Sequence, residues 1–122
     1  MKIPKGALDL SISQAMKSPM QHMHGAVIWK KGKIIGAGYN YHLAAPNTNH
    51  RQMSIHSEKD CLNGLRGDQI YGADMLAIRV TKSGKLSHGA PCNGCKRLLK
   101  RKGIRKVFWY DEKGNLNATR LN

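Results

Sequence analysis

The sequence predicts an α/β fold with a mixed sheet of about five strands. Segments with helical periodicity alternate with short apolar runs that are typical of strands, and turn residues separate them. A length of 122 residues is enough for one hydrophobic core but too short for two. We therefore expect a single domain that spans residues 1–122.

The elements of the N-terminal half can be placed in order. Apolar residues at helical spacing predict an amphipathic helix over residues 5–18, ended by Pro19, with an apolar face of Leu8, Ile12, Ala15 and Met16. Apolar runs at 26–29 and 34–37 flank a polar turn at 30–33, which indicates a β-hairpin. From Asn40 to Met53 the sequence is polar and shows no period, so a long loop is expected.

The C-terminal half predicts two helices and three strands. One helix should begin near Ser54 or His56 and run to about Asn63, closed by Gly64 and Gly67. The other elements are a buried strand at 75–80, a helix at 92–102 capped by Gly103, a strand at 107–110, a turn at 111–115 and a short antiparallel strand within 116–122.

The charge of the chain is strongly unbalanced. The formal net charge is +14, and no acidic residue occurs between Asp9 and Glu58 or between Asp74 and Asp111. The second gap holds ten basic residues, and seven of them lie close together: Lys96, Arg97, Lys100, Arg101, Lys102, Arg105 and Lys106. Such basicity predicts attraction to polyanions, with nucleic acid as the first candidate. A solvated surface or an acidic protein partner remains the alternative.

Segments that would place the chain in a membrane or outside the cell are not evident. No apolar run approaches the roughly 20 residues of a membrane-spanning helix, and no apolar segment follows the basic N-terminus. We expect a soluble cytoplasmic or nuclear protein. Three cysteines, two of them three positions apart, suit a metal or redox site in a reducing compartment better than a disulfide framework.

Two short motifs carry most of the chemical information. His56-x-Glu58 is followed, after 32 intervening residues, by Pro91-Cys92-x-x-Cys95. Zinc binds imidazole and thiolate ligands tetrahedrally, and a catalytic site takes three ligands from the protein and one from water. Cysteines three residues apart share one face of a helix, and a helix N-terminus favours their thiolate forms. The motifs therefore predict a catalytic zinc site.

Glu58 lies two residues after His56, so both side chains can face a metal only at the first turn of a helix, where we expect that helix to begin. There a carboxylate can act as a general base and then as a general acid. Alone, Cys-x-x-Cys would equally fit a structural zinc half-site or a redox pair. A structural site normally needs a fourth ligand, and the candidates are Cys61, His50 and His88, although Cys61 is most simply a small buried residue.

Together the motifs resemble the signature of zinc-dependent nucleobase deaminases, and in particular the cytidine and deoxycytidylate deaminase superfamily. The resemblance extends from Ala26 to Tyr110. It implies a three-layer α/β/α sandwich, with Zn²⁺ held by His56, Cys92 and Cys95 and with Glu58 as the catalytic residue. By this resemblance, water activated by zinc attacks C4 of cytosine, Glu58 protonates N3 and then the leaving ammonia, and uracil is the product.

The same resemblance indicates substrate-binding residues. Asn40 resembles an asparagine that contacts the sugar, and Ser57 stands where the family more often has alanine, at a position whose backbone contacts the base. Ala90 and Tyr110 complete the expected set, because a tyrosine at a strand end can stack on a base. Two other groups stand outside this set. His22, His24 and His42 are expected in loops flanking the pocket, where they could touch a phosphate or a base, although loop histidines of this kind are more often incidental. The strand aromatics Trp29, Phe108 and Trp109 are expected in the core.

Three functions are compatible with these features. The first is deamination of cytosine within single-stranded nucleic acid, which the basic charge favours. The second is deamination of a free nucleotide or nucleoside such as dCMP or cytidine. The third is a catalytically silent nucleic-acid-binding domain, against which the intact Glu58 argues. Many members of the superfamily are dimers or tetramers, so a homo-oligomer is a further candidate.

Overall fold

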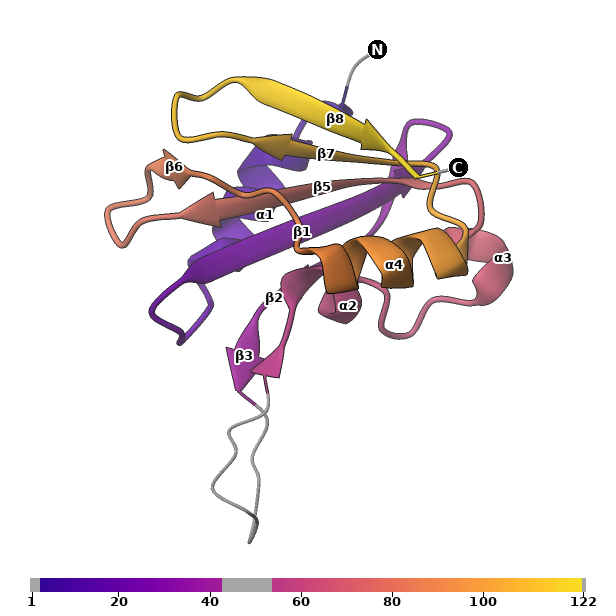
Figure 1. The fold of residues 1–122 in the computed structure, drawn as a ribbon, viewed down its shortest axis with the longest axis horizontal. Helices are drawn as coiled ribbons and strands as arrows, with labels where there is room; N and C mark the ends of the chain where they lie inside the picture. Colours follow the sequence, from indigo (N-terminus) through magenta and orange to yellow (C-terminus); the bar gives the residue numbers. More distant parts are fainter. Residues whose placement is uncertain (1–2, 43–53, 122) are drawn as a thin grey trace, which may run out of the picture.

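A mixed sheet lies between helices on both of its faces in this computed structural model, which describes residues 3–42 and 54–121 (Figure 1). The sheet order is β2-β1-β5-β7-β8, with β6 paired to β5. The strands are β1 Met23–Lys30, β2 Lys33–Tyr39, β5 Asp74–Val80, β6 Leu86–Ser87, β7 Lys106–Tyr110 and β8 Leu116–Arg120. This confirms the expected mixed sheet and adds the short strand β6.

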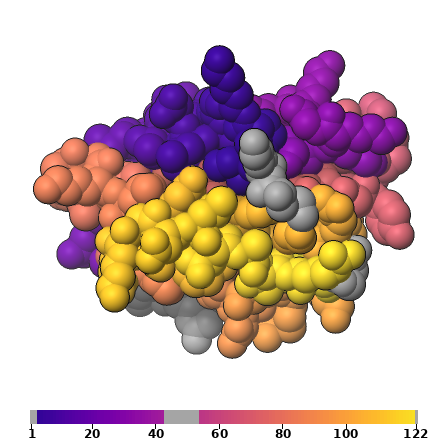
Figure 2. Space-filling view, turned by 90° about the horizontal axis from the view of Figure 1, so that it is seen from above, coloured from indigo at the N-terminus to yellow at the C-terminus, as the bar shows by residue number. Residues whose placement is uncertain are grey.

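The direction of the strands follows from the connections between them. β5 and β7 are parallel because α4 (Asn93–Lys102) lies between them in the chain, whereas the other pairs are antiparallel. The predicted hairpin at 26–37 is confirmed as β1 and β2, and the predicted C-terminal strand as β8. Figure 2 shows the edge at β8, with the N-terminal segment on one side and α4 on the other.

Helix α1 (Ala7–Ala15) covers one face of the sheet through small residues. Ala7, Ser11 and Ala15 are fully buried, whereas Met16, expected on the apolar face, is 46% exposed and lies just beyond the helix. Leu8 and Ile12 pack against the core on this face but are only partly buried. The reason is a close approach to the sheet. A Cβ on Gly25 of β1 would lie 2.1 Å from the Ser11 carbonyl oxygen, so only small side chains fit between helix and sheet.

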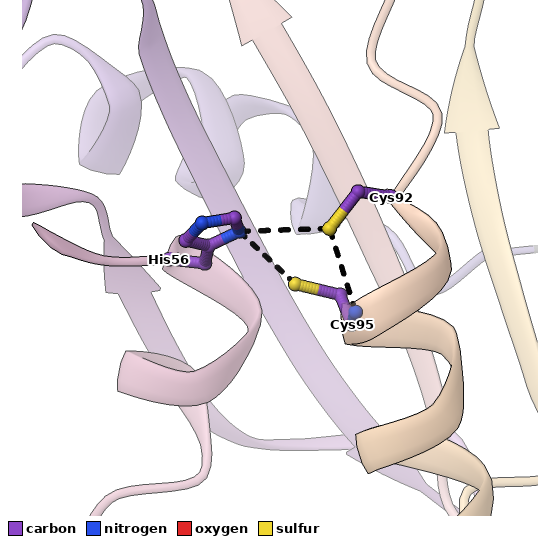
Figure 3. A group of neighbouring side chains, drawn as sticks. All are labelled: His56, Cys92 and Cys95. Atoms are coloured by element: carbon purple, nitrogen blue, oxygen red, sulfur yellow. Dashed lines mark hydrogen bonds between the residues drawn. The ribbon is translucent and has the colours of Figure 1, made fainter.

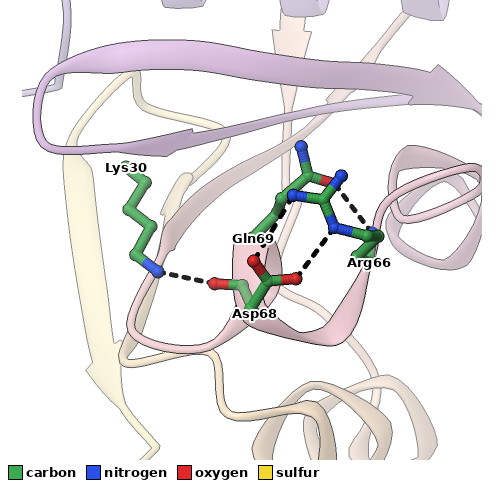
Figure 4. Close-up of polar contacts among 4 residues, drawn as sticks. All are labelled: Lys30, Arg66, Asp68 and Gln69. Atoms are coloured by element: carbon green, nitrogen blue, oxygen red, sulfur yellow. Dashed lines mark hydrogen bonds and ion pairs between the residues drawn. The ribbon is translucent and has the colours of Figure 1, made fainter.

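The other face is covered by α2 (Ser57–Cys61), α3 (Gly67–Ile70) and α4. The helix expected to reach Asn63 ends at Cys61, and Gly67 begins α3 instead of closing α2. Sequence periodicity did not predict α3 because it has only four residues. Side-chain contacts stabilise it: Gln69 Oε1 accepts a hydrogen bond from the Arg66 backbone N–H, and Arg66 pairs with Asp68 at 3.1 Å (Figure 4). Lys30 of β1 donates to the Asp68 carbonyl oxygen.

Short strands near the two ends of the expected loop at 40–53 pair with each other. β3 (Tyr41–His42) and β4 (Ser54–Ile55) form a separate two-stranded antiparallel sheet just before α2. Residues 43–53, between these strands, lie outside the described residues. Within the described residues, no helix is long and apolar enough to cross a membrane.

Candidate metal centre and substrate cavity

His56 and Cys92 occupy equivalent places in two different helices. His56 is the N-cap residue of α2 and Cys92 is the N-cap residue of α4, with extended backbones in both cases. The sheet holds the two helix N-termini side by side, and Cys95 lies on the first turn of α4. Figure 3 shows the three side chains converging from the two helices.

The distances between these side chains fit a zinc ion. His56 Nδ1 lies 3.1 Å from Cys95 Sγ and 3.9 Å from Cys92 Sγ, and one ligand atom from each residue lies within 4.8 Å of the others. Two atoms bound tetrahedrally to one zinc, at zinc–sulfur and zinc–nitrogen distances of about 2.3 and 2.1 Å, would lie about 3.5 Å apart. The backbone N–H of Cys95 also donates to Cys92 Sγ at 3.4 Å, a hydrogen bond that supports a thiolate.

The electrostatics of the group bear on metal binding as well. Burial raises the pKa of the Cys95 thiol, and the negative charge of Glu58 raises it further. Both effects oppose formation of a thiolate, which is the form that binds metal. A divalent cation reverses this balance because it stabilises the thiolates directly. The donor set therefore fits zinc in chemistry as well as in distance.

The candidates for a fourth protein ligand lie elsewhere. Cys61 is buried in the core on the α2 side, as expected, and burial raises the pKa of its thiol. His88 lies 3.9 Å from the Glu112 carboxylate and packs against the ring of Trp109. His50 lies outside the described residues. Within the described chain the group contains three ligands, as a catalytic zinc site does.

Glu58 is 5% exposed, on the first turn of α2 beside the metal group. The Ser57 hydroxyl donates a hydrogen bond of 3.0 Å to Glu58 Oε1, which orients the carboxylate. At the first turn, His56 and Glu58 both reach one cavity, as their spacing predicted.

That cavity has a volume of about 290 Å³, and its lining includes residues of the metal group and His24 at the start of β1. Its lining includes four residues predicted to bind or act on substrate, namely Asn40, Ser57, Glu58 and Ala90. The two metal ligands His56 and Cys92 complete one wall, and Met20, His22, His24, Ser54 and Ile55 form the rest. The volume is near the lower limit of about 300 Å³ for small-molecule pockets.

Asn40 is buried, and its side-chain amide holds the segment before β1 in place. Its Oδ1 accepts from the His24 backbone N–H at 2.9 Å, and its Nδ2 donates to the His22 carbonyl oxygen at 2.7 Å. Nδ2 also lies 3.3 Å from the sulfur of Met20. These contacts give Asn40 a second role that the sequence did not indicate, namely positioning the cavity wall.

Ala90 reaches the cavity because the loop before α4 lies directly on β5. A Cβ on Gly89 would be 2.9 Å from the backbone nitrogen of Arg79, so this close approach requires glycine. The Gly89 N–H donates to the Tyr110 carbonyl oxygen at 3.0 Å. The Tyr110 side chain packs against the α1 side of the core, and Tyr110 is not among the described residues that line the cavity.

The sequence predicted that His22 and His24 flank the pocket, but it did not predict that Arg79 joins them. His24 was expected in a loop but lies in β1, paired in register with Arg79 of β5. Burial lowers the pKa of His24 from 6.5 to about 4, with smaller contributions from Arg79, His56 and His22. The ring is therefore neutral at physiological pH. Of the expected core aromatics, Trp29 and Phe108 are buried and pack together, and Trp109 is half-buried.

Comparison of the sequence with family models and with curated proteins finds no match. Solved structures do match. The dCMP deaminase from the cyanophage S-TIM5 aligns over 91% of this chain and 86% of that chain, at 21% identity and a TM-score of 0.65. Cytidine deaminase from Burkholderia pseudomallei aligns over 95% and 91%, at 17% identity and a TM-score of 0.64.

Cytidine deaminase from Mycobacterium leprae also matches, at 18% identity and a TM-score of 0.58, over 90% of this chain and 87% of that chain. The fold of this chain is thus the one found in cytidine and dCMP deaminases, an α/β/α sandwich around a mixed sheet. It fits the superfamily that the two motifs predicted, and its His-Cys-Cys group could bind zinc.

Proposed function

We propose that this protein catalyses the zinc-dependent hydrolytic deamination of a cytosine-type base. The observation that carries the proposal is the convergence of His56, Cys92 and Cys95 beside one cavity, which His56 and Cys92 line together with the buried carboxylate of Glu58. A structural zinc site has no need for a cavity or for a buried acid beside the ligands. The fold, shared with cytidine and dCMP deaminases, supports the same conclusion.

The roles of the residues follow from their positions. Zinc bound by the three ligands would supply the acidity that brings the pKa of a water molecule near 7. For hydrolysis, the oxygen of a water molecule must bond to C4. Glu58 would carry one proton of that water to N3 of the pyrimidine, and the second proton would leave with the C4 amino group as ammonia, with Glu58 as its carrier. Ser57 keeps the carboxylate in one orientation through its hydrogen bond. The cavity walls exclude bulk water from the base.

The test is the substitution Glu58→Gln, which keeps the shape of the side chain but removes the base. We expect uracil and ammonia formation to fall by about 10²-fold or more, with the zinc content unchanged. The matched control is Glu112→Gln, because Glu112 is an exposed carboxylate that does not line the cavity. If E58Q kept the turnover of the control, Glu58 would not be the proton carrier.

For the substrate, we propose cytosine within single-stranded nucleic acid. Exposed basic residues follow the metal ligands along α4, namely Arg97, Lys100, Arg101 and Lys102. None of the ion pairs found among residues 3–42 and 54–121 involves these four side chains. They are therefore available to phosphates of a strand whose target base enters the cavity.

A free nucleotide is the second candidate, and one observation favours it. The cyanophage dCMP deaminase, whose fold this chain shares, has also been solved in complex with dCMP and dUMP. A cavity of about 290 Å³ accommodates a base and part of its sugar whether or not the nucleotide belongs to a strand. The chemistry at the metal is the same for both substrates.

Uracil formation from a single-stranded oligonucleotide and from dCMP, measured over a salt series, separates the two candidates. For a strand we expect kcat/KM to fall steeply with salt, because each phosphate contact contributes to the slope. Lys100→Gln and Arg101→Gln together should lower that slope. Turnover of dCMP alone, with little dependence on salt, would contradict the strand proposal and leave the deaminase proposal intact.

A further inference from the structure

A cationic pair lies beside the cavity, next to the start of β1. Arg79 of β5 donates a hydrogen bond of 2.6 Å from Nη2 to Nδ1 of His22, and the ring of His22 lines the cavity. Arg79 is also the register partner of His24, which lines the same wall. His22 is exposed and Arg79 is half-buried, whereas Glu58 is buried in the same cavity.

The hydrogen bond determines which groups the pair can offer to a ligand. A guanidinium can only donate, so Nδ1 of His22 must accept, and the neutral ring carries its proton on Nε2. Arg79 has further N–H groups besides the one that it gives to His22. His22 Nε2 and Arg79 together therefore present donors and one fixed positive charge, which is the combination that binds phosphate.

The position of this charge matches the shape of a nucleotide. The metal group and Glu58 occupy one part of the cavity wall, and His22 and His24 occupy the part formed by the start of β1. Because the cavity holds little more than a base and its sugar, a phosphate on that sugar would lie outside, beside this pair. The neutral His24 ring between them adds no competing charge.

We propose that Arg79 and His22 bind the phosphate group of the target nucleotide and so select nucleotides over nucleosides. This inference rests on the proposed function for the identity of the base. The phosphate can come from two sources, either the monoester of a free nucleotide or a phosphodiester beside the target base in a strand. The recognition chemistry is the same in both cases.

The test measures binding by calorimetry in an E58Q background, so that no ligand is consumed. The ligands are deoxycytidine, dCMP and a three-nucleotide strand with cytosine at its centre. We expect Arg79→Gln to lower the affinity for dCMP, for the strand or for both, relative to deoxycytidine, by about tenfold or more, since charge-assisted hydrogen bonds are lost. A loss confined to dCMP identifies the monoester as the source, and a loss confined to the strand identifies the phosphodiester.

Two further variants make the result specific. Arg66→Gln removes one positive charge at the N-cap of α3, where Arg66 does not line the cavity. It should leave the affinities for dCMP and for the strand, relative to deoxycytidine, unchanged. Arg79→Lys keeps the charge but loses the planar donor geometry, so it should recover part of the discrimination. It also replaces R79Q if that variant unfolds.

Equal affinity of the Arg79→Gln and Arg66→Gln variants for dCMP and for the strand would overturn the inference. So would an equal loss for deoxycytidine and both phosphorylated ligands, because Arg79 would then act only on the fold or on the base. The proposed function fails separately, if the unsubstituted zinc-loaded protein releases no ammonia from any of the three ligands.

Discussion

Replacing His24 with glutamine should remove a specific part of the acid sensitivity of the fold. The neutral His24 ring is half-buried, and burial is the largest cause of its low pKa of about 4. The charged groups that face it are Arg79, His56 and His22, each of which also lowers the pKa. In the unfolded chain the ring regains its usual value of 6.5, so folding favours the unprotonated form.

The direction of the effect follows from proton binding. Between about pH 6.5 and pH 4 the unfolded chain binds a proton at His24 that the folded chain does not. The contribution to stability is therefore complete above about pH 6.5 and is lost progressively as the pH falls toward 4. Between pH 7.5 and pH 5 the two pKa values correspond to about 2 kcal/mol. Because the ring is only half-buried, screening by solvent reduces this to about 1 kcal/mol.

The assay is thermal unfolding of the wild type and of H24Q at pH 7.5 and pH 5. Both proteins lose stability in acid, partly because the metal ligands take up protons, and the difference between the two proteins isolates His24. We expect the midpoint of H24Q to fall by about 4 °C less than that of the wild type, as about 1 kcal/mol implies for a domain of this size. Equal falls in the two proteins would refute a buried neutral His24.

Two further substitutions test the metal group and the helix contact. Cys95→Ala should reduce bound zinc, measured by elemental analysis, from about one ion per chain to none. The control Cys61→Ala should retain the zinc, because Cys61 lies in the core. Equal retention of zinc in the two variants would exclude Cys95 as a ligand. Gly25→Ala should lower the free energy of unfolding in urea by about 3 kcal/mol or more, because its Cβ would overlap the Ser11 carbonyl oxygen. The control is Gly67→Ala, because a Cβ on Gly67 meets no atom within 4 Å. It should change the free energy of unfolding by about 0.5 kcal/mol or less. Similar losses of stability in the two variants would contradict the close packing at Gly25.

Local patterns predicted most of the fold. The hairpin, the buried strand β5, the helix capped by Gly103 and the last strand all follow from runs of apolar residues bounded by turn residues. The predicted face of α1 was wrong only at Met16, and for a tertiary reason. Large apolar residues normally mark the buried face, but the sheet approaches so closely at Gly25 that Ser11 and the two alanines are buried instead of Met16.

The candidate metal ligands could be predicted because their identities and short spacings are local features. His56 and Glu58 are two residues apart, and Cys92 and Cys95 are three residues apart, so each pair depends on one helix end. The rest of the cavity depends on strand register. Arg79 and His22 are 57 residues apart in the sequence, and they form a hydrogen bond because of the register in which β1 and β5 pair. That register cannot be read from any local sequence pattern.

The two ends of the cavity have opposite electrostatic requirements. Cys92, Cys95 and Glu58 concentrate negative charge once the thiols ionise, so that end binds a cation and repels a phosphate. Arg79, beside the opposite wall, attracts a phosphate. A nucleotide has an uncharged base and an anionic phosphate, so it can enter in only one orientation without placing like charges together. That orientation would place the base toward the candidate metal group and the phosphate toward the guanidinium of Arg79.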